Sequence, residues 1–399
     1  MPHPYPTGAE ALLIALQTPA PKGYLGIPVM IWGRPGVGKS SFLEGLARED
    51  FPVLTLIASI HDPTDFSGLP VFHEGKVHYA VPEWTSQFEP HGQGLLLLDE
   101  LTTAPPAVQA ALLRVVLERR VGFHALPPGV RIVAAANPPD LTTGGWELSA
   151  PLRNRFVHLE WELEPATYLN ALQQGWPTAE RPTIDPDGHH RRLPFWQLRI
   201  AAFLRRAPEL LHTPPDEGPY AFASPRSWDF AAALLASCDL LGQAPLPGQV
   251  GSLACLALLK GCVGEGAALP LVEFLRHLKL PDPASVLDGE AMVTVAEFDD
   301  SELYVLFGGL ARELTQRLES PDILLPAERF LQLTETVFAD GRRDLVYVAL
   351  KQVIRAGLFP KMLAAAQQRD KATSERVMKI INHLIKDPGL EEFITAFEK

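Results

Sequence analysis

A glycine-rich run, GRPGVGKS at residues 33–40, has the composition of a loop that binds phosphate. It matches the pattern G-x-x-x-x-G-K-[ST] in full, between an apolar run, IPVMIW, and a helical run, SFLEGLARED. In that setting, backbone N–H groups of the loop and of the helix start converge on one anionic oxygen. We expect Lys39 to reach the β- and γ-phosphates of a nucleotide and Ser40 to offer a hydroxyl to Mg²⁺. The full set of expected nucleotide contacts is Pro35, Gly36, Val37, Gly38, Lys39, Ser40 and Ser41.

Two carboxylates follow a second apolar run, GLLLLDEL at residues 94–101. The carboxyl ends of parallel strands meet at the edge of a sheet where ligands bind, so this run would bring its carboxylates to the phosphate loop. Asp99 is then expected to hold the Mg²⁺ shell and Glu100 to activate water. A strand that ends in Asp-Glu is weak evidence alone and becomes strong after a complete phosphate loop.

A third polar group follows the run AAANPP at residues 134–139. Asn137 would lie near the γ-phosphate, where its amide could orient the attacking water. An Asn-Pro pair also closes strands as a turn, and the two roles are compatible.

Arginines mark two further segments, PLRNRF at 151–156 and FASPRSWDF at 222–230. Arg153 and Arg155 are expected at the end of a short helix, just before the fifth strand. They are either exposed surface charge or a finger that stabilises the transition state on a neighbouring subunit. Whether Arg153 shares that role with Arg155 is open. Arg226 falls in the first turn of a helix that Ser224 caps. Either this segment only caps the helix, or Arg226 is a cation that a second domain brings onto the phosphates.

The elements that must position these residues are those of an α/β fold with a parallel sheet. Expected strands are 27–32, 53–59, 94–99, 130–136 and 156–161; expected helices are 9–17, 39–49 and 105–119. The alternating stretch VFHEGKVHYA, 71–80, predicts a β-hairpin that turns at Gly75 and interrupts this rhythm. A proline-rich stretch at 175–225 contains a helix at about 195–206, and helical periodicity runs from 226 to the end, for example over 374–386.

Composition limits the function classes. The chain has 399 residues, 47% of them hydrophobic, and a net charge of −12, which disfavours nucleic acid as the main ligand. Three cysteines, Cys238, Cys255 and Cys262, lack metal-site spacing and are expected to be small core residues. Neither a signal peptide nor a membrane span is apparent, so we expect a cytoplasmic protein.

Together and in this order, these motifs resemble the AAA+ ATPases, and more closely their MoxR-type branch. The segment LLLLDELTTAPPAVQAALLRVVLERRV, with HDPTDFSG, AAANPP and SPRSW, carries the resemblance to that branch. The resemblance implies that residues 33–40 are Walker A and that Asp99 and Glu100 are Walker B. It further implies that Asn137 is sensor 1, Arg155 a finger acting in trans, and Arg226 sensor 2.

From the resemblance we expect three regions: an α/β nucleotide-binding domain at 1–162, a helical lid at 163–270, and a helical extension of unassigned role at 271–399. ATP and Mg²⁺ are the implied cofactors. The implied assembly is a hexameric ring that remodels a protein client, with a von Willebrand factor A domain protein as the partner. A nucleotide-gated binding module with slow hydrolysis is the main alternative, and an NTPase that remodels nucleic acid is a weaker one.

Overall fold

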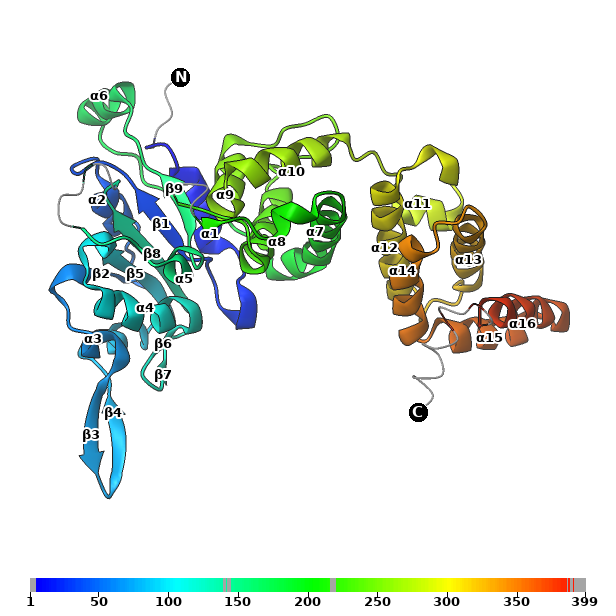
Figure 1. Ribbon diagram of the computed structural model, residues 1–399, viewed down its shortest axis with the longest axis horizontal. Helices are drawn as coiled ribbons and strands as arrows, with labels where there is room; N and C mark the ends of the chain where they lie inside the picture. The colour runs from blue at the N-terminus through cyan, green and yellow to red at the C-terminus, as the bar shows by residue number, and fades with distance from the viewer. Residues whose placement is uncertain are drawn as a thin grey trace. The chain divides into compact units, whose positions relative to one another are not determined.

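The computed structural model describes residues 5–138, 141, 145–215, 220–385, 387 and 390. It divides into two compact units, one of residues 1–200 and 207–276 and one of residues 201–206 and 277–399 (Figure 1). The expected division into an α/β domain at 1–162, a lid at 163–270 and an extension at 271–399 remains a prediction.

A five-stranded sheet with the order β2-β5-β8-β1-β9 forms the centre of the first unit, and all its strand pairs are parallel. The strands are β1 (Val29–Trp32), β2 (Val53–Ile57), β5 (Gln93–Asp99), β8 (Gly129–Ala136) and β9 (Val157–Glu160). Their ends lie within two residues of the expected ones. The predicted parallel α/β sheet is therefore confirmed.

Helices lie between successive strands, as the crossover connections of a parallel sheet require. Those around the sheet are α1 (Ala9–Gln17), α2 (Lys39–Glu44), α3 (Thr64–Ser67), α4 (Pro106–Glu118) and α5 (Ala150–Arg153). The expected helix at 39–49 is shorter than predicted, because Gly45 caps it and the chain then turns back through a bridge between Arg48 and Phe51. The core between sheet and helices includes Met30, Leu96, Leu98 and Leu112, all fully buried.

Two hairpins lie outside the sheet, in the connections between its strands. The predicted one pairs β3 (Leu69–His73) with β4 (Lys76–Ala80), and Glu74 and Gly75 turn it with φ angles of 48° and 75°. All ten of its strand residues are exposed, and Figure 1 shows it extending away from the sheet. A second, short hairpin of β6 (Arg120–Val121) and β7 (His124–Ala125) was not predicted, because two-residue strands leave no periodicity to detect.

Helices complete the first unit after β9. They are α6 (Pro165–Gln174), α7 (Pro186–Arg206, whose last six residues belong to the second unit), α8 (Pro225–Leu240), α9 (Leu253–Val263) and α10 (Glu265–His277). Helix α7 begins nine residues before the expected helix at 195–206. The observed helix continues through Pro194, whereas the expected one begins after it. Helix α8 begins where predicted, with a capping box between Ser224 and Ser227.

The second unit is helical, as predicted. Its helices are α11 (Pro283–Asp288), α12 (Asp300–Gln316), α13 (Leu324–Ala339), α14 (Asp344–Arg355), α15 (Leu358–Arg369) and α16 (Lys371–Ile385). A separate hydrophobic core holds them, and Phe307 and Phe330 pack in it with ring centroids 5.9 Å apart.

Helix α9 approaches β9 so closely that glycine is required at the contact. A Cβ at Gly261 would lie 2.2 Å from the carbonyl oxygen of His158, which is backbone and cannot move aside. We expect Gly261→Ala to lower the free energy of unfolding by about 2 kcal/mol or more. Urea unfolding of the full chain measures this, with Gly266→Ala as the matched control because nothing lies within 4 Å of a Cβ there. Equal effects of both substitutions would contradict the packing argument.

Candidate functional site

The phosphate loop connects β1 to α2 at the carboxyl edge of the sheet. Gly36 and Gly38 have φ angles of 78° and 80°, the left-handed region that glycine adopts without strain, and Gly38 is the residue that caps α2. Gly33 is needed for a different reason, since a Cβ there would lie 2.6 Å from the carbonyl oxygen of Trp161. The loop thus has the compact path and the helix start that the sequence predicted.

Lys39 is buried at the centre of this loop. Its Nζ donates to the carbonyl oxygens of Gly33, at 2.5 Å, and Arg34, at 3.1 Å, and to Oδ1 of Asn137, at 3.1 Å. Burial lowers the pKa of Lys39, and the nearby charge of Asp99 acts in the opposite direction. An ammonium held among oxygens in this way is positioned to donate to anionic phosphate oxygens.

Asp99 and Ser40 come together although 59 positions separate them in the chain. The hydroxyl of Ser40 donates to Oδ2 of Asp99 at 2.7 Å, and the N–H of Glu100 donates to Oδ1 of Asp99 at 2.9 Å. Mg²⁺ prefers oxygen ligands, so a carboxylate and a hydroxyl in contact are a donor pair that fits the expected ion.

Glu100 adopts a left-handed backbone conformation, with φ of 54° and ψ of 38°. Such a conformation is uncommon for a residue with a long side chain and is found at functional sites. The Glu100 carboxylate is exposed, and its Oε2 accepts a hydrogen bond from Ser59 at 3.3 Å. The sequence analysis missed Ser59, whose only local signal is its position just beyond the end of β2.

Arg155 lies at the opposite edge of the sheet from the phosphate loop. Val157 pairs with Val29 at the start of β1, whereas the loop follows the end of β1 at Trp32. At about 3.3 Å per residue, the chain's own phosphate loop is more than 13 Å from this end of the strand, beyond the reach of an arginine side chain. Arg155 donates from one terminal nitrogen to the carbonyl oxygen of Pro151, and its Nε has no hydrogen-bond partner among the described residues.

Arg226 lies near Arg155. The hydroxyl of Ser224 at the start of α8 donates to Oδ1 of Asn154 at 2.9 Å, which holds this helix end against the turn that carries Arg155. Burial lowers the pKa of Arg155, and the charge of Arg226 lowers it further. The structure therefore places Arg226 close enough to Arg155 for its charge to act on that residue, and it keeps Arg155 away from Lys39 of the same chain.

Arg153 has a different environment from Arg155. Its guanidinium donates to the carbonyl oxygen of Pro215 and lies over the ring of Phe222, 5.6 Å from the ring centroid. Both partners precede α8. Arg153 thus contacts the segment that leads into α8.

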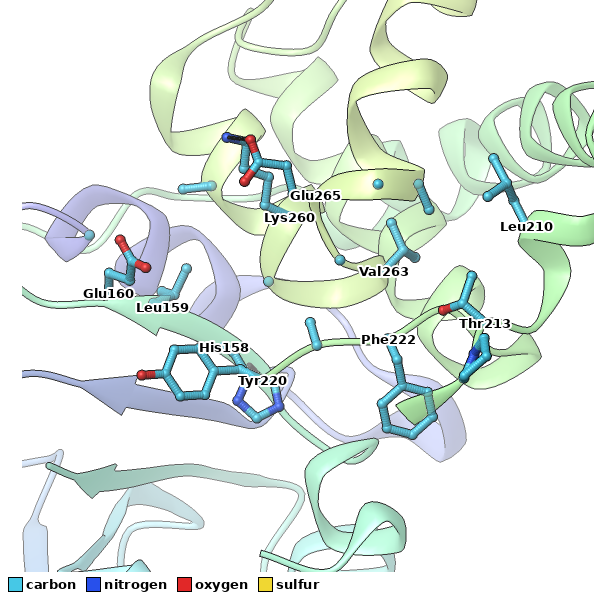
Figure 2. Close-up of a pocket in the computed structure, with 18 of the residues that line it drawn as sticks. His158, Leu159, Glu160, Leu210, Thr213, Tyr220, Phe222, Lys260, Val263 and Glu265 are labelled. Carbon is cyan, nitrogen blue, oxygen red and sulfur yellow. Dashed lines mark hydrogen bonds and ion pairs between the residues drawn. The ribbon is translucent and has the colours of Figure 1, made fainter. Parts of the chain in front are cut away.

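A cavity of about 620 Å³ lies along β9, between the strand, the segment before α1 at Thr7 and Gly8, and the α9–α10 connection (Figure 2). Lys260 and Glu265 form an ion pair at 3.0 Å on its border. His158 and Tyr220 line it, with ring centroids 6.1 Å apart.

The three cysteines are buried in the helices of the first unit as free thiols. Burial raises the pKa of Cys262, and a hydrogen bond with Cys255, together with burial, raises that of Cys238. Among the described residues, no group of three or more His, Cys, Asp or Glu side chains is arranged to hold a metal ion. Within the same residues, none of the helices has the length and apolar character needed to cross a bilayer.

Comparison with known proteins identifies the segment that contains the loop and the carboxylates. The model of the AAA_3 family, described as "ATPase family associated with various cellular activities (AAA)", matches residues 28–158. Chaperone MoxR1 of Mycobacterium tuberculosis is 33% identical over 153 residues, which are 37% of this chain and 37% of that protein. The Psp operon transcriptional activator of Escherichia coli is 34% identical over 138 residues, 32% of this chain and 42% of that protein.

The chain thus spans less than half the length of these curated relatives. Among solved structures, a full-length MCM homolog from Methanopyrus kandleri is similar to 66% of this chain and 54% of its own, with a TM-score of 0.36 and 18% sequence identity.

Proposed function

We infer, from the membership of residues 28–158 in the AAA_3 family of ATPases, that the whole chain binds ATP with Mg²⁺ and hydrolyses it. The observation that carries this proposal is the convergence of Lys39, Asn137, Ser40 and Asp99 at one edge of the sheet. These groups come from three adjacent strands, β1, β8 and β5, and each has the chemistry that a triphosphate site needs.

Each side chain has a separate part in the reaction. Lys39 exchanges its carbonyl partners for the β- and γ-phosphate oxygens, and Asn137 orients the water that attacks the γ-phosphorus. Glu100, held by Ser59, accepts a proton from that water as the bond to the γ-phosphorus forms and the bond to the β-phosphate oxygen breaks. Ser40 and Asp99 would hold Mg²⁺, which when bound neutralises charge on the phosphate oxygens.

The arginines require a second subunit. A chain with its phosphate loop at one edge of the sheet and Arg155 at the other completes a site only when copies associate head to tail. Such contacts form a ring when the rotation from one copy to the next closes. We therefore assign Arg155 to the nucleotide of a neighbouring subunit. Because Arg226 lies beside Arg155, we assign it to the same neighbouring nucleotide rather than to its own. A hexamer is the ring that the MoxR resemblance implies.

The work done by the ring is proposed to be the remodelling of a protein client. The exposed hairpin β3–β4 supports this, since Phe72 is 75% exposed and Val77 59%, which leaves an apolar surface for a polypeptide. A relative of the matched segment, MoxR1, is named a chaperone. We further propose a von Willebrand factor A domain protein as the client, in line with the MoxR resemblance.

Remodelling of nucleic acid is a second candidate, because another relative of the same segment is named a transcriptional activator. The net charge of −12 disfavours it, since phosphate backbones are bound by basic surfaces. Stimulation of ATP hydrolysis by duplex DNA, falling steeply with added salt, would favour this candidate over a protein client.

The direct test of nucleotide binding is Lys39→Met. We expect a Kd for Mg·ATP that is about 10- to 100-fold higher, because a buried ammonium that donates to phosphate is lost while the stem of the side chain is kept. Titration with a fluorescent, non-hydrolysable ATP analogue measures this. Lys22→Met, at a surface position outside the site, is the control. An unchanged affinity in Lys39→Met would contradict the assignment of this loop.

A further inference from the structure

A buried imidazole connects the phosphate loop to the turn that carries Arg155. Trp32, the residue directly before Gly33, donates from its indole Nε1–H to Nδ1 of His158 at 2.9 Å. The other ring nitrogen of His158, Nε2, lies 3.0 Å from the carbonyl oxygen of Arg153. Both aromatic side chains are almost fully buried.

The two partners determine the tautomer of His158. An indole can only donate a hydrogen bond and a carbonyl can only accept one, so Nδ1 carries the lone pair and Nε2 the proton. Burial lowers the pKa of His158 to about 4, so the ring is neutral near pH 7. A neutral ring with one donor and one acceptor satisfies both neighbours, which a protonated ring could not.

The carbonyl that His158 holds is the one that closes the turn. The N–H of Phe156 also donates to the carbonyl oxygen of Arg153, at 3.1 Å, which closes a four-residue turn with Arg155 at its third position. Asn154, at the second position, is held by Ser224. The ring of Tyr220 stacks on Trp32, with ring centroids 4.2 Å apart, and lies beside the ring of His158, with ring centroids 6.1 Å apart, where both line the cavity in Figure 2.

We propose that His158 is a positioning residue that orients the 153–156 turn, so that Arg155 is aimed at the nucleotide of the neighbouring subunit. This inference rests on the proposed assignment of Arg155 to a neighbour. His158 touches no phosphate; it acts through the carbonyl of Arg153 on one side and through Trp32 on the other. Arg155, which acts at the neighbouring subunit's nucleotide, is thereby linked to the end of β1, where the chain's own phosphate loop begins.

Two substitutions separate positioning from general packing. The amide nitrogen of His158→Gln can take the place of Nε2 and still donate to Arg153, but it leaves the buried indole N–H of Trp32 without its acceptor. The amide of His158→Asn reaches only the position of Nδ1, so it can accept from Trp32 but no longer donates to the carbonyl oxygen of Arg153. We expect His158→Gln to be the less stable variant and His158→Asn the less active one.

The first measurement is steady-state hydrolysis of Mg·ATP by each full-length variant, with urea unfolding and analogue binding alongside. His158→Asn is expected to lose about tenfold or more in kcat, with an unchanged Kd for the analogue, while His158→Gln stays close to wild type in kcat. If activity instead follows stability, so that His158→Gln is the more impaired enzyme, the imidazole of His158 contributes only packing and the proposal is wrong.

The second measurement mixes subunits. Glu100→Gln subunits lack a water-activating carboxylate but keep Arg155, whereas His158→Asn subunits keep their own carboxylate. In a random 1:1 ring, about a quarter of the sites pair a working carboxylate with a well-aimed arginine, so hydrolysis should exceed that of either variant alone. Mixtures of His158→Asn with Arg155→Ala should show no such recovery, because both lack the same contribution.

A control mixture separates failure of this inference from failure of the proposed function. Arg155→Ala mixed with Glu100→Gln must regain hydrolysis if Arg155 serves a neighbour. If that control recovers but His158→Asn mixed with Glu100→Gln does not, His158 acts at its own site and the inference alone is overturned. If the control itself does not recover, both the neighbour assignment and the role of His158 are overturned.

Discussion

Replacing Arg155 with alanine is expected to lower kcat for ATP hydrolysis by about 10³-fold in the assembled protein, with little change in the Kd for Mg·ATP. The reason is geometric. Arg155 is too far from its own phosphate loop to help bind nucleotide there, so the substitution leaves the chain's own ATP contacts intact. What is lost is a planar, permanently charged group that stabilises the charge of the transition state at the neighbouring site.

Hydrolysis at saturating ATP and analogue binding, measured on the same preparation, check this prediction. Arg369→Ala, at an exposed position on α15, is the matched control for loss of an arginine. Assembly should be verified by mass or by imaging with a non-hydrolysable analogue. Turnover at the wild-type rate in an assembled Arg155→Ala ring would remove this residue from the mechanism.

The second large effect is expected from Glu100→Gln. The amide keeps the size and the hydrogen bond with Ser59 but cannot take a proton from water, so kcat should fall by about 10²- to 10³-fold. Binding of Mg·ATP should be retained, because Lys39, Ser40 and Asp99 are untouched. The variant should therefore accumulate bound ATP rather than ADP.

Single-turnover hydrolysis and analysis of the bound nucleotide measure the effect of Glu100→Gln. Glu49→Gln, an exposed glutamate after α2, is the control for loss of one negative charge. A variant that still converts its bound ATP to ADP at the wild-type rate would show that another group activates the water. A loss of binding instead of hydrolysis would mean that Glu100 contacts the nucleotide itself.

Some of the site could be predicted because its parts are contiguous in the chain. The loop at 33–40 is one unbroken pattern, and the buried strands that end at Asp99 and Ala136 are continuous apolar runs. Parallel strands bring their carboxyl ends to one edge, so the meeting of Lys39 with Asn137 and of Ser40 with Asp99 follows from the fold class. The hairpin at Glu74 and Gly75 was predictable for the same local reason.

Contacts between distant segments could not be predicted. Ser59 reaches Glu100 because β2 lies beside β5, and the residues around Ser59 do not indicate which strand pairs with β2. His158 lies in the run FVHLEW, where the sequence pattern does not distinguish it from any other polar residue of a strand. Its bond to Trp32 requires that β9 pair with β1, a strand order that the sequence pattern left undefined.

By itself, the amino-acid sequence determined that this protein has the pattern of a phosphate loop, a carboxylate pair, an α/β sheet and a long helical continuation. Those features depend on local spacing and on hydrophobic periodicity. Only the tertiary structure decided that the start of α8, two residues before Arg226, lies against the turn that carries Arg155, at the sheet edge opposite the phosphate loop. The physical reason is that the direction and the neighbour order of strands in a sheet are set by packing of the whole unit. The bond between Asn154 and Ser224 therefore joins two segments that carry arginines 71 positions apart, and neither segment's sequence predicts it.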